Sequence, residues 1–309
     1  QLNEQQVAEL AEKSNAETMK KFNARPGTAS NQYLHDLYRF FKLSVRRNEF
    51  RDIFKEKLDL HHVPALDNLL YCEEELFPIA DFYLSKERWD EAIDIYKELI
   101  EIGGFEGEGA EYYQKFGYAL QKRKRYAEAI EAYLKADTLK PDNIWNNRHL
   151  ATCYRLNRNY EAALAYYKKV EEATPEDTNV IFHIGSCLAE LGQYEEAANY
   201  FFKLDFIESN CIKAWRGIGW CSFISRKYEQ AMKYYEKIIE QKPLAIDYMN
   251  AGHVAWTMGD IQKAAALYGK SITANGNRER FLEMFRKDEE ALLKQGIQEE
   301  DIPLMLDLL

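Results

Sequence analysis

The chain has few residues that interrupt helices, with 7 Pro and 15 Gly among its 309 residues. Charged residues make up 30% of it and hydrophobic residues 46%, an ordinary balance for a protein in water. Proline and glycine are the residues that fit a helix interior least well. Their scarcity beside many charged side chains therefore favours a mostly helical fold.

An excess of positive charge is also missing. The net charge is -10 and the isoelectric point is near 5.3, which argues against non-specific binding of nucleic acid. No apolar run reaches the length of a membrane span, and the first residues lack the form of a signal peptide. The chain begins with Gln1 rather than Met, which indicates a processed or partial sequence.

Cysteines with paired spacing are absent as well. The five cysteines are Cys72, Cys153, Cys187, Cys211 and Cys221. An odd number argues against a disulfide framework, so we expect a cytoplasmic protein. Cys153, Cys187 and Cys221 recur at one constant interval. We expect them to be buried, and roughly 10 Å apart, which is too far for one metal ion.

No catalytic signature is present. The sequence contains no Gly-rich phosphate loop, no Gly-x-Ser-x-Gly, no His-Glu-x-x-His and no Cys-x-x-Cys. The carboxylates fall at helical spacing from Lys and Arg, as on a solvated helix face. We expect no enzyme, no cofactor and no metal site, although His149, His183 and His253 all fall on related helices.

What the chain does contain is an internal repeat. The stretch from Arg125 to Pro141 places Ala129, Tyr133 and Ala136 on one stripe of a helix. Its context recurs around a series of anchoring alanines, which are almost evenly spaced from Ala129 onward. The anchors are Ala92, Ala129, Ala163, Ala197, Ala231 and Ala264.

A second fixed point precedes each anchor by the same interval, and it is always a small residue. These residues are Ala80, Gly117, Ala151, Gly185, Gly219 and Gly252. The apolar spacing around them is again helical, so each unit is a pair of helices. The turns between paired helices are expected at 122–126, 156–160, 191–194, 225–228 and 258–261.

These residues resemble the tetratricopeptide repeat, which has a period of about 34 residues. Trp215, Gly219, Ala231, Tyr235 and Pro243 stand at positions of its pattern, as does Ile218, whereas Ser222 departs from it. The resemblance implies an all-α fold, a right-handed α-solenoid of about six tetratricopeptide-type helix pairs with helical N- and C-terminal flanks. The predicted repeats are 73–106, 110–143, 144–177, 178–211, 212–244 and 245–278.

The flanks follow weaker patterns. Residues 1–30 suggest a polar helix and loop, and 31–72 a degenerate helix pair. Residues 279–309 are expected to form capping helices, since a stack of repeats exposes its last apolar face. Asp301 is expected to cap the last helix, and Leu304, Leu306, Leu308 and Leu309 either fold back on the cap or mark a sequence cut before its natural end.

The resemblance also implies that the free side of each first helix lines a concave groove that holds a partner. The groove residues so predicted are Trp145, Arg148, His149, Thr152, Arg155, Asn179, Phe182, His183, Ser186, Lys213, Arg216, Trp220, Asn250, His253 and Trp256. Aromatic and Arg side chains are enriched at binding hot spots. The set is positive in its middle, so the expected partner is a protein or peptide with acidic and apolar side chains.

The carboxylate clamp of this family is not matched. Arg148 and Lys213 could supply its cations, but Thr152, His183 and Gly217 stand where it has Asn, Asn and Arg. Two other interpretations remain open. The groove could be filled by residues 1–30 or 297–309 or by a second copy, giving a structural or self-associating solenoid. The chain could also be a regulatory arm of a larger protein.

Overall fold

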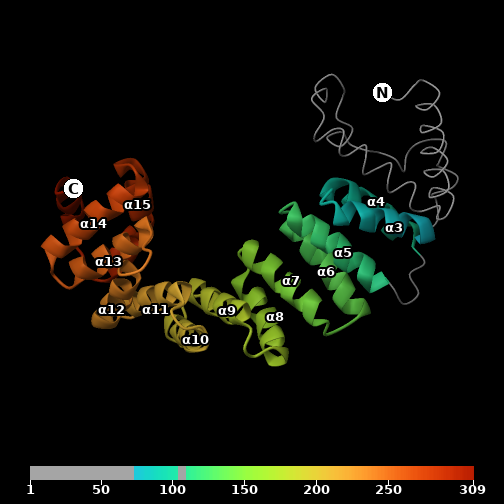
Figure 1. Cartoon of the computed structure of the whole chain (residues 1–309), viewed down its shortest axis with the longest axis horizontal. Helices are drawn as coiled ribbons and strands as arrows, with labels where there is room; N and C mark the ends of the chain where they lie inside the picture. Colours follow the sequence, from blue (N-terminus) through green and yellow to red (C-terminus); the bar gives the residue numbers. More distant parts are fainter. Residues whose placement is uncertain (1–72, 104–108) are drawn as a thin grey trace, which may run out of the picture. The chain divides into compact units, whose positions relative to one another are not determined.

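The computed structural model describes residues 73–103 and 109–309. The predictions for 1–30 and 31–72 lie outside these residues. A boundary between two compact units lies between Tyr83 and Leu84, so the described part belongs to the second unit apart from residues 73–83. The described part contains helices and no strands. The helices, drawn in Figure 1, are α3 (Glu73–Ser85), α4 (Trp89–Ile102), α5 (Gly109–Lys122), α6 (Tyr126–Leu139), α7 (Ile144–Leu156), α8 (Tyr160–Ala173), α9 (Thr178–Glu190), α10 (Tyr194–Ile207), α11 (Ile212–Ile224), α12 (Tyr228–Ile239), α13 (Ala245–Thr257), α14 (Ile261–Asn275), α15 (Arg278–Lys294) and α16 (Asp301–Asp307).

The helices are arranged as consecutive pairs in the second unit. From α5 to α14, each helix packs against its own partner and then against the next helix along the chain. First helices also meet one another, as α9 meets α11 and α11 meets α13. This arrangement confirms the predicted all-α solenoid of helix pairs. No helix within the described residues is long and apolar enough to cross a membrane.

The turn inside each pair has the same backbone geometry. One residue per turn lies in the left-handed region, with φ between 60 and 86° at Lys124, Arg158, Gly192, Arg226 and Gly259. The next residue donates its N–H to a carbonyl five positions back, as Asn159 does to Tyr154 at 2.9 Å. This is the Schellman form of helix ending. Because the same turn recurs, the second helix of each pair leaves the first in the same direction, so the pairs have a similar geometry.

In four of the pairs the core contains a glycine of the first helix packed beneath an aromatic ring of the second. Gly252 lies under Tyr268 so closely that an added Cβ would stand 2.5 Å from Cε1 of the ring. Gly117 under Tyr133 and Gly219 under Tyr235 repeat the contact. The two recurring spacings found in the sequence, one of small residues on the first helix and one of aromatic residues on the second, therefore describe residues that pack against each other.

The three periodic cysteines are buried free thiols, as expected. Burial raises the pKa of Cys153 and Cys221 to about 12 and that of Cys187 to about 11. Their thiols are protonated at neutral pH and act as small core side chains.

The last two helices close the end of the second unit. Helix α15 packs on α13 and α14 through Phe281, Phe285 and Leu292, all fully buried. Helix α16 begins at Asp301 itself, so the prediction that Asp301 caps this helix is wrong. Glu300 precedes the helix and makes no side-chain cap.

The C-terminal leucines divide into two groups. Leu306 and Leu309 pack against the core, together with the buried Ile302 and Met305. Leu304 and Leu308 point the other way and are 64% and 65% exposed.

We predict that Gly252→Ala lowers stability by about 1–3 kcal/mol, because the new methyl group overlaps the Tyr268 ring. The matched control is Gly269→Ala in α14, where a Cβ meets nothing within 4 Å. That change should raise stability by up to about 1 kcal/mol, since alanine favours a helix interior. Urea unfolding midpoints measure both. Equal shifts in the two variants would contradict the packing account.

Candidate binding face on the first helices

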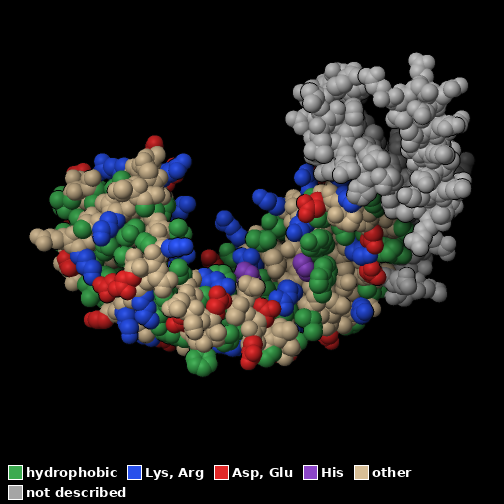
Figure 2. All heavy atoms as spheres, in the orientation of Figure 1, with side chains coloured by type: hydrophobic (Ala, Val, Ile, Leu, Met, Phe, Trp, Pro, Cys, Tyr) green, Lys and Arg blue, Asp and Glu red, His purple; other side chains and the backbone are tan. Residues whose placement is uncertain are grey.

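The face formed by α5, α7, α9 and α11 carries most of the groove residues predicted from the sequence. Figure 2 shows His side chains among Lys and Arg over the stretch from α7 to α9. Trp145, at the start of α7, is the most open aromatic of the set, with 42% of its surface exposed. The centre of its ring lies 4.0 Å from the centre of the His149 ring and 6.0 Å from that of the Tyr118 ring. These two rings pack against Trp145 and fix its position.

A glutamine holds His149 in place. Oε1 of Gln121 accepts a hydrogen bond from the Tyr133 hydroxyl at 3.0 Å and lies 2.8 Å from Nδ1 of His149. With the amide in this orientation, Nδ1 carries the proton and Nε2 is the acceptor. Burial, with Lys122 and Arg148 nearby, lowers the pKa of His149 to about 4. His149 is therefore neutral at physiological pH.

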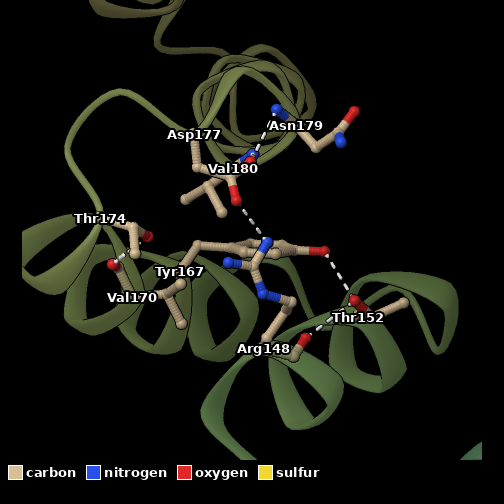
Figure 3. Close-up of polar contacts among 8 residues, drawn as sticks. All are labelled: Arg148, Thr152, Tyr167, Val170, Thr174, Asp177, Asn179 and Val180. Atoms are coloured by element: carbon tan, nitrogen blue, oxygen red, sulfur yellow. Dashed lines mark hydrogen bonds and ion pairs between the residues drawn. The ribbon is translucent and has the colours of Figure 1, made fainter. Parts of the chain in front are cut away.

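Arg148 joins one repeat to the next. Its Nη1 donates to Oδ2 of Asp177 at 2.7 Å, across from α7 to the start of α9 (Figure 3). Oδ1 of Asp177 accepts from the N–H groups of Asn179 and Val180, which caps α9. The charge of Arg148 is thus compensated inside the chain.

Arg216 is held in the same manner. Its Nε and Nη2 donate to the two carboxylate oxygens of Asp247 at 2.6 and 2.7 Å. Asp247 is fully buried and also accepts from the N–H of Leu244. Arg216 therefore joins α11 to α13, and two cations expected to meet a ligand already have partners.

The other polar residues of the face differ in the hydrogen bonds that they make within the chain. Thr152 donates to the carbonyl of Arg148 at 2.8 Å, and its Oγ1 is 3.1 Å from the Tyr167 hydroxyl. Ser186 donates to the carbonyl of Phe182, whereas the main-chain N–H of Asn179 is taken up in the cap of α9.

The cations and rings of α9 and α11 lie together. Nζ of Lys213 is 5.8 Å from the centre of the Phe182 ring and 3.5 Å from Oε2 of Glu208. Phe182 and Trp220 are half-buried, and Trp220 packs on Phe223. Arg155 and His183 are half-buried as well.

The prediction of an open groove is wrong for two residues of α13. His253 has no exposed surface and Trp256 almost none, because Phe285 of α15 packs against both rings. His253 also contacts the Tyr268 hydroxyl at 2.8 Å. Asn250 is half-buried on the same helix. The sequence held a signal for His253, which follows its fixed glycine, whereas His149 and His183 precede their fixed small residues.

Sequence reasoning also missed two residues that shape the face. Tyr118 and Gln121 on α5 contact His149 but were not among the predicted set. Gln121 precedes His149 by the same interval as Arg155 precedes His183. This repeated interval was the sequence signal that could have added Gln121 to the predicted face, since Arg155 was already in it.

Comparison with known proteins agrees with this geometry. Residues 76–104, 212–243 and 248–278 match models of the tetratricopeptide repeat. Residues 122–204 match the family described as anaphase-promoting complex, cyclosome, subunit 3. The chain belongs to the tetratricopeptide repeat family. No curated protein matches its sequence.

Solved tetratricopeptide repeat structures share the fold at low identity. A tetratricopeptide repeat protein from Parabacteroides merdae has a TM-score of 0.55 at 20% identity, covering 78% of this chain and 98% of that one. YrrB, described as having an unusual peptide-binding site, has a TM-score of 0.51 at 21% identity over 62% of this chain and 97% of its own. Pseudomonas aeruginosa pilF has a TM-score of 0.51 at 17% identity, over 69% and 96%. The family and fold support a protein-interaction scaffold.

The link between α7 and α9 should be visible in the titration of Asp177. Burial acts to raise the pKa of Asp177, but the hydrogen bonds from Arg148 and Val180 outweigh it and lower the pKa. The stability that this pair contributes is therefore present above the unfolded-state pKa, near 3.8, and is lost as pH falls through the folded-state value.

We predict that Arg148→Gln raises the pKa of Asp177 and lowers stability at neutral pH by about 1 kcal/mol. Carboxyl-carbon NMR follows the pKa, and urea unfolding follows the stability. Lys168→Gln is the control, because its exposed pair with Glu196 spans 3.5 Å and should contribute little. An unchanged Asp177 titration in Arg148→Gln would show that the ion pair does not form.

Proposed function

We propose that this tetratricopeptide repeat chain is a non-catalytic protein–protein interaction scaffold that binds a peptide or partner segment on the first helices. The face concerned is made by α5, α7, α9 and α11. The observation that carries the proposal is Trp145, a large ring 42% exposed and fixed by Tyr118 and His149 beneath it. A rigid, accessible aromatic loses little entropy when a ligand covers it.

The side chains on this face determine which kinds of partner side chain it can bind. Phe182 and Trp220 are half-buried rings on the first helices that follow α7, and they suit apolar side chains. Lys213 is held by a carboxylate less closely than Arg148 or Arg216, because its ion pair with Glu208 spans 3.5 Å and theirs span 2.7 and 2.6 Å. Arg155 forms no ion pair with a described residue. Arg148 and Arg216 belong to the frame instead. We therefore expect a partner with acidic and apolar side chains, not nucleic acid, met in the cytoplasm.

The fold relationship is consistent with this function. YrrB is described as a tetratricopeptide repeat protein with a peptide-binding site. At 21% identity it shares the fold alone, so the proposal depends on the residues of this chain and not on that resemblance.

We predict that Trp145→Ala weakens partner binding by about 2 kcal/mol or more, since central aromatic anchors dominate interfaces. Affinity capture followed by mass spectrometry identifies the partner, and calorimetry measures its affinity. The matched control is Phe206→Ala, which removes a 90% exposed ring from the end of α10, on a second helix. Equal binding by the two variants would remove the first-helix face from the account.

Self-association is a second candidate, favoured by two exposed leucines, Leu304 on α16 and Leu308 directly after it. Two open leucines at one short helix could pair with those of a second copy. If they do, the double variant Leu304→Ser, Leu308→Ser should be monomeric in light scattering while the parent is dimeric. This variant leaves the buried Ile302 and Met305 in place. A monomeric parent chain would dismiss the candidate.

A further inference from the structure

A cavity of about 220 Å³ opens between the second helices α10 and α12 and the end of the first helix α11. Cys221 and Ser222 of α11 line its interior and are both buried. Glu195 and Lys227 line it as well, and because both are exposed they form its rim. None of these four residues belongs to the proposed binding face on the first helices, so the cavity is a separate feature of the chain.

Two small side chains account for the cavity. Ser222 departs from the repeat pattern, and the two preceding repeats have Tyr154 and Leu188 at its position. Ala198, which lines the cavity from α10, stands where the preceding second helix has Leu164. An empty cavity between packed helices lowers stability, because its lining atoms lose contacts. A ligand that fills the space would restore those contacts.

The volume of the cavity limits what it can hold. An engineered apolar cavity of about 150 Å³ in another protein binds benzene. Pockets for drug-sized ligands have volumes of about 300–1,000 Å³. The cavity beside Ser222 lies between these sizes. It therefore suits a molecule the size of a free amino acid and is too small for a peptide or a nucleotide.

The interior of the cavity offers both apolar and polar contacts. The Phe202 ring and the neutral thiol of Cys221 supply apolar surface. Ser222 donates its hydroxyl to Oε1 of Gln230 at 3.1 Å. The NH₂ group of this amide has no hydrogen-bond partner among the described residues, so it remains available to a ligand.

The rim carries one charge of each sign. Glu195 lies in the first turn of α10, and Lys227 lies directly before α12. Neither forms an ion pair with a described residue, whereas the neighbouring Glu196 pairs with Lys168. An acidic and a basic side chain at one small cavity match a ligand that itself carries an ammonium and a carboxylate group.

We propose that this cavity binds a small zwitterion, a free α-amino acid. Its ammonium group pairs with Glu195 and its carboxylate with Lys227. Its side chain enters the cavity between Phe202 and Ala198. Such a ligand contacts α10, α11 and the start of α12 at once, so its binding stabilises the junction between two repeats. This function goes beyond partner binding on the first helices and does not depend on it.

Small probes test both the size and the charges of the ligand. L-alanine, L-serine and L-leucine carry both charges and differ in side chain, and the N-acetyl amide of each carries neither charge. Calorimetry with the whole chain measures affinity, and the thermal unfolding midpoint reports stabilisation. We expect at least one amino acid to bind saturably and to raise the midpoint. Its N-acetyl amide should bind about tenfold or more weakly.

Two substitutions fill the cavity with residues that the chain itself uses at the same repeat positions. Ser222→Leu copies Leu188, and Ala198→Leu copies Leu164. We expect the new side chain to occupy the space, so that the variant unfolds no earlier than the parent and no longer binds the amino acid. Two variants are made because one leucine can overpack the junction.

The rim charges are tested at exposed positions, where a substitution leaves the fold intact. We expect Lys227→Gln and Glu195→Gln each to weaken amino-acid binding about tenfold or more. The matched control is Lys233→Gln, which removes the same charge from an exposed position of α12 outside the cavity. Its affinity should stay within about twofold of the parent's.

Three results would overturn the proposal. The first is that none of the three amino acids binds saturably, and the second is that an amino acid and its N-acetyl amide bind equally well. The third is unchanged affinity in a folded Ser222→Leu or Ala198→Leu chain, which would place the ligand elsewhere. None of these results depends on the protein partner, so the scaffold and the cavity are tested separately.

Discussion

The contact between a glycine on a first helix and an aromatic ring on the second, found in four of the pairs, is the interaction on which the packing of the solenoid depends. At Gly252 there is no room for a Cβ beneath Tyr268, and at Gly117 and Gly219 the clearance is nearly as small. This close approach fixes the distance within each pair, and the common left-handed turn fixes its direction. Together they place one side of each helix from α5 to α14 in contact with neighbouring helices. The opposite side of the first helices does not take part in this packing.

That remaining side joins successive repeats, and we propose that it also binds the partner. At Arg148 and Arg216 it joins repeats, through carboxylates at the start of a later first helix. Between these links it carries aromatic rings, of which Trp145 is the most exposed. The ion pairs therefore fix the helices that carry the proposed binding residues. A change at Arg148 or Arg216 would disturb both, which makes these residues poor probes of ligand binding.

Periodicity made the fold predictable from the sequence, because each repeat buries the same positions and ends its helices at the same turn. The candidate face was predictable only in outline. From the sequence, Arg148 and Arg216 had no obvious carboxylate partner. Asp177 follows Arg148 by 29 residues and Asp247 follows Arg216 by 31, so the two aspartates do not share one repeat position. His253 and Trp256 looked open because their burial depends on α15, which lies outside the repeat pattern. The interval from Gln121 to His149 is repeated between Arg155 and His183, but the hydrogen bond that Gln121 makes to His149 is visible only in the structure.

The most direct test of the central claim is site-specific photo-crosslinking from the first-helix face. A benzophenone side chain at position 145 replaces an exposed ring on α7, and the same group at position 206 replaces an exposed ring on α10. The account predicts one discrete adduct with a partner protein from position 145 and none from position 206. An adduct from position 206 alone, or none from position 145 in the presence of a partner that binds the parent chain, would contradict it.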